Sequence, residues 1–145
     1  MPLVRCSDQK RQTLEQTYSE LASAENKFSA EIGKSMLPFI ELIKETFPQT
    51  EIYGLTSMHH LVLLATDSWK SHWFVKFIYH GTEFNIEYLM PEDISPWPLA
   101  RVHGTARTMS DAKKYLIIAM TESRGWPDSQ ELENLYQQII DDRTK

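Results

Sequence analysis

Apolar residues recur at helical spacing through the first third of the chain. They stand three, four or seven positions apart and so mark one face of a helix. The stripe consists of Leu14, Tyr18, Leu21, Phe28 and Ile32. Ser7 is the expected N-cap. Gly33 and Pro38 weaken a continuous helix, so the pattern leaves two options open over residues 8–47: one kinked helix, or two helices with Ser35 capping the second.

The middle of the chain changes to the alternating pattern of strands. We expect strands at 52–55, 61–66, 72–79, 84–90 and 99–105, with a tight turn at His80-Gly81 between the third and fourth. One face of this predicted hairpin is rich in aromatic residues and belongs in the core: Trp73, Val75, Phe77, Tyr79, Phe84, Ile86 and Tyr88. The opposite face is mixed and belongs on the wetter side of the sheet: His72, Phe74, Lys76, Ile78, Asn85 and Glu87.

The segment 91–98, PEDISPWP, contains three prolines and cannot hold regular structure. Two helices are expected after the last strand. Thr108 and Asp111 form a capping pattern for the first, which Gly125 can terminate. Asp128 is the expected cap of the second, whose apolar stripe runs through residues 132–140.

This order of elements predicts an α+β fold. An N-terminal helix or helix pair precedes an antiparallel sheet of four or five strands, and two C-terminal helices follow. The length of 145 residues and the absence of any linker or repeat predict a single globular domain over residues 1–145.

Charge and composition narrow the class of protein. The hydrophobic fraction of 41% and the charged fraction of 24% are typical of globular chains. The N-terminus lacks the apolar run of a secretory signal, and no stretch is long enough to span a bilayer, so we expect a cytoplasmic protein without a membrane partner. The net charge of −5 and the scattered Lys and Arg residues argue against direct nucleic-acid binding and favour a basic protein partner.

No sequence motif indicates catalysis, a metal or a cofactor. The five histidines form neither HxH nor HExxH, so no metal site is predicted. Cys6 lies near the terminus, and neither a GxSxG motif nor a Gly-rich phosphate loop is present. We therefore expect no catalytic residues and no cofactor. A basic group of Arg101, His103 and Arg107 with Lys76 and His72 fits a solvated strand face better than an anion site.

Aromatic and acidic residues are the better clue to function. Three of the four tryptophans lie in or beside predicted turns, where Trp marks either an interface or a lid on the core. The expected partner-binding residues come from the hairpin end and the proline-rich segment: Trp69, His72, Lys76, Glu87, Glu92, Asp93 and Trp97.

These features favour a non-enzymatic protein-binding domain. Its most specific form is an immunity protein, or antitoxin, that neutralises a basic toxin such as a nuclease by covering its active site. Two alternatives remain open: a small acidic secretion or folding chaperone, and a small enzyme with a histidine general base. Because such chaperones are usually dimers, the oligomeric state, monomer or homodimer, separates the first two hypotheses.

Overall fold

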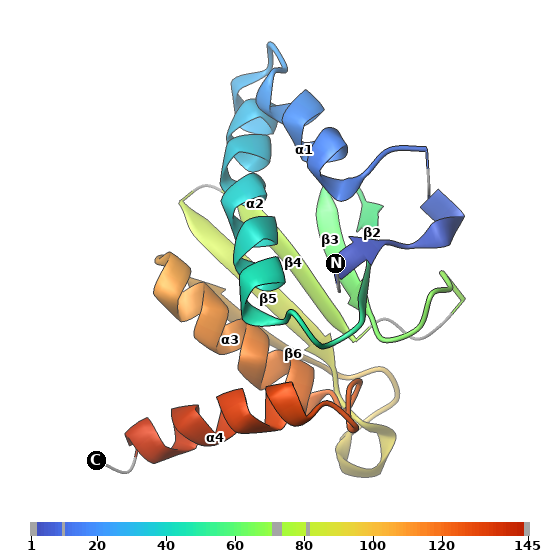
Figure 1. The fold of residues 1–145 in the computed structure, drawn as a ribbon, viewed down its shortest axis with the longest axis vertical. Coiled ribbons are helices and arrows are strands. Elements are labelled where there is room, and N and C mark those ends of the chain that lie inside the picture. Colours follow the sequence, from blue (N-terminus) through green and yellow to red (C-terminus); the bar gives the residue numbers. More distant parts are fainter. Residues whose placement is uncertain (1–2, 10, 71–73, 81, 144–145) are drawn as a thin grey trace.

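A computed structural model describes residues 3–9, 11–70, 74–80 and 82–143, and these form an α+β fold of four α-helices and one six-stranded sheet (Figure 1). The strands are β1 Leu3–Arg5, β2 Ile52–Ser57, β3 His60–Leu64, β4 Val75–His80, β5 Glu83–Leu89 and β6 Arg101–Ala106. The α-helices are α1 Leu14–Ala22, α2 Lys27–Thr46, α3 Met109–Glu122 and α4 Gln130–Arg143. Two short 3-10 helices are η1 Ser7–Gln9 and η2 Glu92–Ile94.

The strands follow the chain order from β1 to β6 across the sheet. All neighbours pair antiparallel except β1, which lies parallel to β2 with Leu3 opposite Ile52. The expected antiparallel sheet of four or five strands is therefore wrong in detail, although the α+β class is confirmed. Strand β1 was not predicted, because it has only three residues and pairs with a distant segment. It is too short to show an alternating pattern of its own.

The hydrophobic core lies between one face of the sheet and the helices. Helix α2 contacts β4, helix α3 contacts β4 to β6, and α1 packs along α2 (Figure 1). At the centre of the core, the rings of Phe39 and Phe77 stack with their centroids 3.9 Å apart. The ring centroid of Phe84 lies 5.5 Å from that of Phe39. The hairpin residues Val75 and Ile86 are also buried, as the alternation predicts. Trp73 and His72 lie outside the described residues.

The N-terminal region forms two helices, but the break falls earlier than expected. Helix α1 begins after Thr13, which makes a capping box with Gln16, and helix α2 begins after Asn26, whose side chain accepts the backbone N–H of Phe28. Ser7 instead begins a 3-10 turn. Because the break lies between Tyr18 and Phe28, it resets the helical phase, and Phe28 is 52% exposed instead of buried.

Two further details of these helices differ from expectation. Pro38 lies inside α2 and not in its first turn, and Ser35 is a helical residue instead of a cap. Pro38 is exposed, so the carbonyl that lacks its N–H partner lies on the hydrated side of the helix. Gly33 is buried in the same helix, where it faces α1.

The C-terminal helices form where the sequence predicts them, with small shifts at their ends. Thr108 caps α3 by accepting the backbone N–H of Asp111 at 3.1 Å. This helix ends at Glu122, before Gly125. Ser129, one residue after the expected Asp128, accepts the backbone N–H of Leu132 in the first turn of α4.

The hairpin turn is likewise displaced by one residue. Strand β4 extends through His80, which pairs with Glu83, so the connection begins after His80. No helix among the described residues is long and apolar enough to cross a membrane.

Candidate functional site

Several connections meet at one end of the sheet, which we call the loop end. Strands β3 and β5 finish there, and β4 and β6 begin there. The α3–α4 connection also lies at this end, where Gly125 packs against the ring of Phe74. The contact is so close that a Cβ built on Gly125 would lie 2.7 Å from that ring. The indole N–H of Trp126 donates to the backbone carbonyl of Glu51 at 3.0 Å. Trp126 is 7% exposed, and this tryptophan therefore forms a lid on the core.

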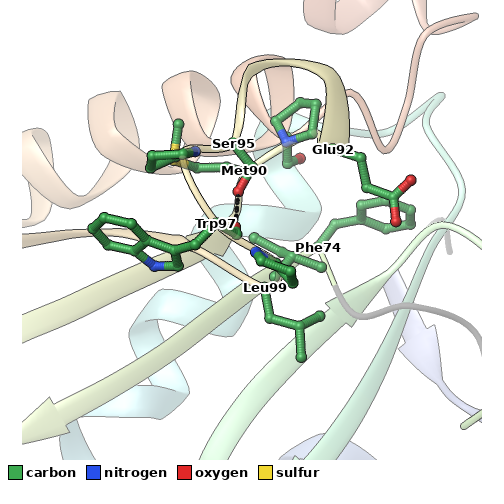
Figure 2. A pocket seen from close by; sticks show the side chains of 11 residues that line it. Phe74, Met90, Glu92, Ser95, Trp97 and Leu99 are labelled. Atoms are coloured by element: carbon green, nitrogen blue, oxygen red, sulfur yellow. Dashed lines mark hydrogen bonds between the residues drawn. The ribbon is translucent and has the colours of Figure 1, made fainter.

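The proline-rich loop, residues 90–100, is the most irregular of these connections. Its two ends are tied by a hydrogen bond from the Met90 N–H to the Ala100 carbonyl at 2.9 Å. Within it, the Ser95 hydroxyl bonds the Trp97 carbonyl (Figure 2). Leu99 has a φ of 61°, a left-handed conformation that is costly for a branched side chain. These contacts tie the ends and the middle of the loop, which lies outside the sheet ladder.

This loop encloses a pocket of about 630 Å³ (Figure 2). The volume is in the usual range of ligand sites, about 300–1,000 Å³. Most of the wall comes from the loop, and Phe74, Leu89 and Ser123 complete it. The loop contributes Met90, Pro91, Glu92, Ser95, Pro96, Trp97, Pro98 and Leu99.

Three large apolar side chains of the proline-rich loop are exposed, and two of them, Trp97 and Leu99, line the pocket. Ile94 is 52% exposed, Trp97 67% and Leu99 69%. Single exposed apolar residues are ordinary, but three within six consecutive positions of one loop form a patch. A patch of this kind with a tryptophan beside a pocket is typical of a protein-binding surface.

The proline-rich loop carries two carboxylates, and only one of them is paired with a positive charge among the residues that the structure describes. Arg124 Nη1 lies 2.7 Å from Asp93 Oδ1, and this hydrogen bond lowers the pKa of Asp93 below its ordinary value. Glu92 is exposed, and no hydrogen bond or ion pair within the described part of the chain engages its carboxylate. The loop therefore presents one compensated and one uncompensated negative charge.

Two other expected contact residues, Lys76 and Glu87, pair with each other on the outer face of the sheet. Lys76 Nζ lies 3.2 Å and Arg101 Nη1 3.4 Å from the Glu87 carboxylate. Burial raises the pKa of Glu87, but the hydrogen bond and charge of Lys76 and the charge of Arg101 outweigh it, so the pKa is lowered. The expected basic face is thus partly neutralised by Glu87.

Two histidines, His60 and His103, line a small cavity near this face. Glu87 also lines this cavity of about 110 Å³, which is smaller than common ligand sites. Among the described residues no group of three or more His, Cys, Asp or Glu side chains could hold a metal ion.

Trp69 belongs to a different surface. It is 59% exposed, and its backbone N–H donates to Asp8 of η1 at 2.8 Å. Asp67 similarly accepts the Ser7 N–H at 2.7 Å, which fastens η1 to the β3–β4 connection. Trp69 does not line the pocket of the proline-rich loop.

The seven residues expected to bind a partner are thus only partly gathered. Glu92, Asp93 and Trp97 share the proline-rich loop, Lys76 and Glu87 form an ion pair on the sheet, Trp69 stands apart, and His72 lies outside the described residues. Phe74, Leu99 and Arg124 belong to the site but were not among the expected contact residues. Leu99 was expected to begin a strand at 99–105, but β6 begins at Arg101, so Leu99 lies in the loop.

No protein-family model, curated protein or solved structure matches this chain. Inference about function therefore rests on the geometry of the site.

Proposed function

We propose that this chain is a non-enzymatic protein-binding domain that captures a basic partner at the proline-rich loop. The observation that supports this most directly is the exposed apolar patch of Ile94, Trp97 and Leu99, of which Trp97 and Leu99 line a pocket together with Glu92. Tryptophan at the centre of such a patch supplies burial, and carboxylates at its rim select cations. The net charge of −5 favours fast association with a basic surface.

The most specific form of this proposal is an immunity protein for a basic toxin, such as a nuclease. The loop would cover the toxin's active site, with Trp97 buried in the interface and Glu92 paired with a lysine or arginine that otherwise binds phosphate. Inhibition then needs no catalytic group on this chain. Trp69, Lys76 and Glu87 lie off this loop, and we place them outside the docking surface.

The test is calorimetry between this protein and the basic C-terminal domain encoded by the reading frame directly upstream. The proposal predicts a Kd of nanomolar or tighter, which corresponds to about −12 kcal/mol, and loss of toxin activity in the complex. An unrelated neighbour, or a basic domain that does not bind, would remove the immunity assignment.

A chaperone is the second candidate, and the edge of the sheet favours it. In an antiparallel pair, residues alternate between hydrogen-bonded and non-hydrogen-bonded positions. The Met90–Ala100 hydrogen bond and the β5–β6 register show which positions of β6 are hydrogen-bonded to β5. By that alternation Val102 and Gly104 bond to β5, whereas His103 and Thr105 direct their backbone groups away from it. No described strand pairs beyond β6, so a second copy could add there and form a dimer.

Sedimentation equilibrium separates the two candidates. A monomer across the micromolar range agrees with the immunity assignment. A constitutive dimer that Thr105→Pro dissociates would favour the chaperone, because proline removes an edge donor without breaking the bonds to β5.

A further inference from the structure

We propose that the pocket of the proline-rich loop receives a lysine or arginine side chain of the partner. This inference rests on the proposed function, since it specifies what the docking surface recognises. It follows from the walls of the pocket, from the state of its polar atoms and from its single charge.

The walls are suited to the stem of a long side chain. Three prolines, Phe74, Leu99 and Trp97 present apolar surface around the cavity. In Figure 2, Trp97 and Glu92 stand on opposite sides of the view. A ligand that contacts both needs an apolar length and a polar end, which the stems and heads of lysine and arginine combine. Arginine adds stacking on an aromatic face.

The two serine hydroxyls of the lining already donate their protons within the protein. The Ser95 hydroxyl bonds the Trp97 carbonyl, and the Ser123 hydroxyl donates to the Met120 carbonyl at 3.1 Å. Their protons are therefore not available to a ligand, and Trp97 contributes an indole N–H, which is a neutral donor. Glu92 is the charged acceptor of the lining, so it can select a cationic ligand by polar contact.

The carboxylate of Glu92 determines that the ligand is positively charged. It is the one ionisable residue among the described residues that line the pocket, and Asp93 beside it is already paired with Arg124. An anion would be repelled by Glu92. An apolar side chain would displace water from the carboxylate without replacing its hydrogen bonds, which is unfavourable. A cation replaces those bonds with charge-assisted ones.

The size of the pocket indicates that more than the side chain enters. About 630 Å³ exceeds what one lysine or arginine needs, and the cavity is open to solvent. The backbone of the partner segment that carries the cation therefore fits within the rim, against the exposed Trp97 and Leu99.

The experiment uses blocked tripeptides whose central residue is arginine, lysine, citrulline or norleucine, titrated into the 15N-labelled full chain. The reporter is the indole N–H signal of Trp97, assigned by its loss in Trp97→Phe. We expect the arginine or lysine peptide to shift this signal saturably, and citrulline and norleucine to bind about tenfold more weakly. The stronger of the two cationic peptides identifies the preferred head group.

Two charge-removing variants test whether the cationic peptide contacts Glu92. Glu92→Gln should weaken the cationic peptide about tenfold. Glu25→Gln, the same charge change at an exposed residue between α1 and α2, should leave it unchanged. Equal binding of all four peptides, no shift with any of them, or equal effects of the two variants would each overturn the inference.

The result is separable from that of the proposed function. If a basic toxin domain binds the wild type and Glu92→Gln equally, the binding function stands and the inference about the pocket fails. If the arginine peptide binds in a Glu92-dependent way but no upstream domain binds, the pocket inference stands and the immunity assignment fails.

Discussion

At the scale of single residues, burial determines how the chemically reactive groups behave. Cys6 is the single cysteine of the chain and is fully buried in a small cluster with Val62 and Leu64 on the outer face of the sheet. Burial raises the pKa of its thiol. Since the thiolate is the nucleophile, a buried thiol of raised pKa is unreactive. The position of Cys6 near the N-terminus gives no indication of this protection.

We predict that Cys6 in the native protein resists labelling by a disulfide reagent at neutral pH. The same thiol should react completely within minutes in denaturant. The measurement is the release of the coloured thiolate from the reagent over time. Fast labelling of the native chain would contradict the packing of the cluster around Val62 and Leu64.

Glu87 shows the opposite case, a charge held in its ionised form by its neighbours. Its side chain is 22% exposed, and Lys76 and Arg101 both contact it. Because its folded pKa is lowered below the ordinary 4.5, its contribution to stability is fully present above that value. The contribution is lost as pH falls from there through the folded pKa.

Accordingly, Glu87→Gln should lower the free energy of unfolding by about 0.5–1 kcal/mol at pH 7. The difference from wild type should stay constant above about pH 5 and shrink below pH 4.5. Urea unfolding at a series of pH values measures this. The matched control is Glu83→Gln, whose partner Arg107 is 80% exposed and which should change stability little. A difference that grows on acidification would contradict the assignment.

At the scale of elements, close packing decided where the N-terminal helices end. Sequence periodicity indicated one or two helices over residues 8–47, and the structure has two, at Leu14–Ala22 and Lys27–Thr46. Local signals put the break near Gly33 and Pro38 instead of between these helices. The backbone of α2 approaches that of α1 at Gly33, where a Cβ would lie 2.3 Å from the Ala22 nitrogen. This glycine is a contact between helices and not a helix terminator. Such a role depends on the partner helix and cannot be read from local sequence.

We predict that Gly33→Ala destabilises the protein by about 1–3 kcal/mol, in spite of alanine's better helix propensity. The obstacle is backbone, which cannot rotate away as a side chain can. Gly104→Ala is the matched control, because its Cβ would meet nothing nearer than 3.8 Å. Urea unfolding should place the control close to wild type. Equal stability of the two variants would show that α1 and α2 do not pack this closely.

The sheet was predictable to the extent that its strands carry their own pattern. The alternation of β4 and β5 gave the core face of the hairpin correctly, since Val75, Phe77, Phe84 and Ile86 are buried. The expected wetter face is wrong in part, because Phe74 and Ile78 pack partly buried against the core. Strand β1 was missed because pairing with β2, and not its own three residues, makes it a strand. The edge position of β6 is likewise a property of the assembled sheet.

At the scale of the whole molecule, the candidate site is a product of topology. Because β3 and β5 end where β4 and β6 begin, the connections gather at one end and bring Phe74 and Ser123 to the proline-rich loop. The sequence pointed to Glu92, Asp93 and Trp97 by composition alone. It could not show that Arg124 neutralises Asp93 and leaves Glu92 uncompensated, since that depends on the α3–α4 connection.

We proposed that the proline-rich loop is the docking surface, and a comparison of two exposed tryptophans tests this proposal. Trp97, 67% exposed, lies on that loop, whereas Trp69, 59% exposed, lies beside η1. The affinity of Trp97→Ala and of Trp69→Ala for the basic domain encoded upstream should be measured by calorimetry.

We predict that Trp97→Ala weakens binding by at least 2 kcal/mol, about thirtyfold, while Trp69→Ala stays within about threefold of wild type. Trp69 does not line the pocket, so Trp69→Ala removes an exposed indole without changing the pocket. This variant is therefore the control for Trp97→Ala. Equal losses in the two variants, or a loss confined to Trp69→Ala, would contradict the account and move the docking surface away from the proline-rich loop.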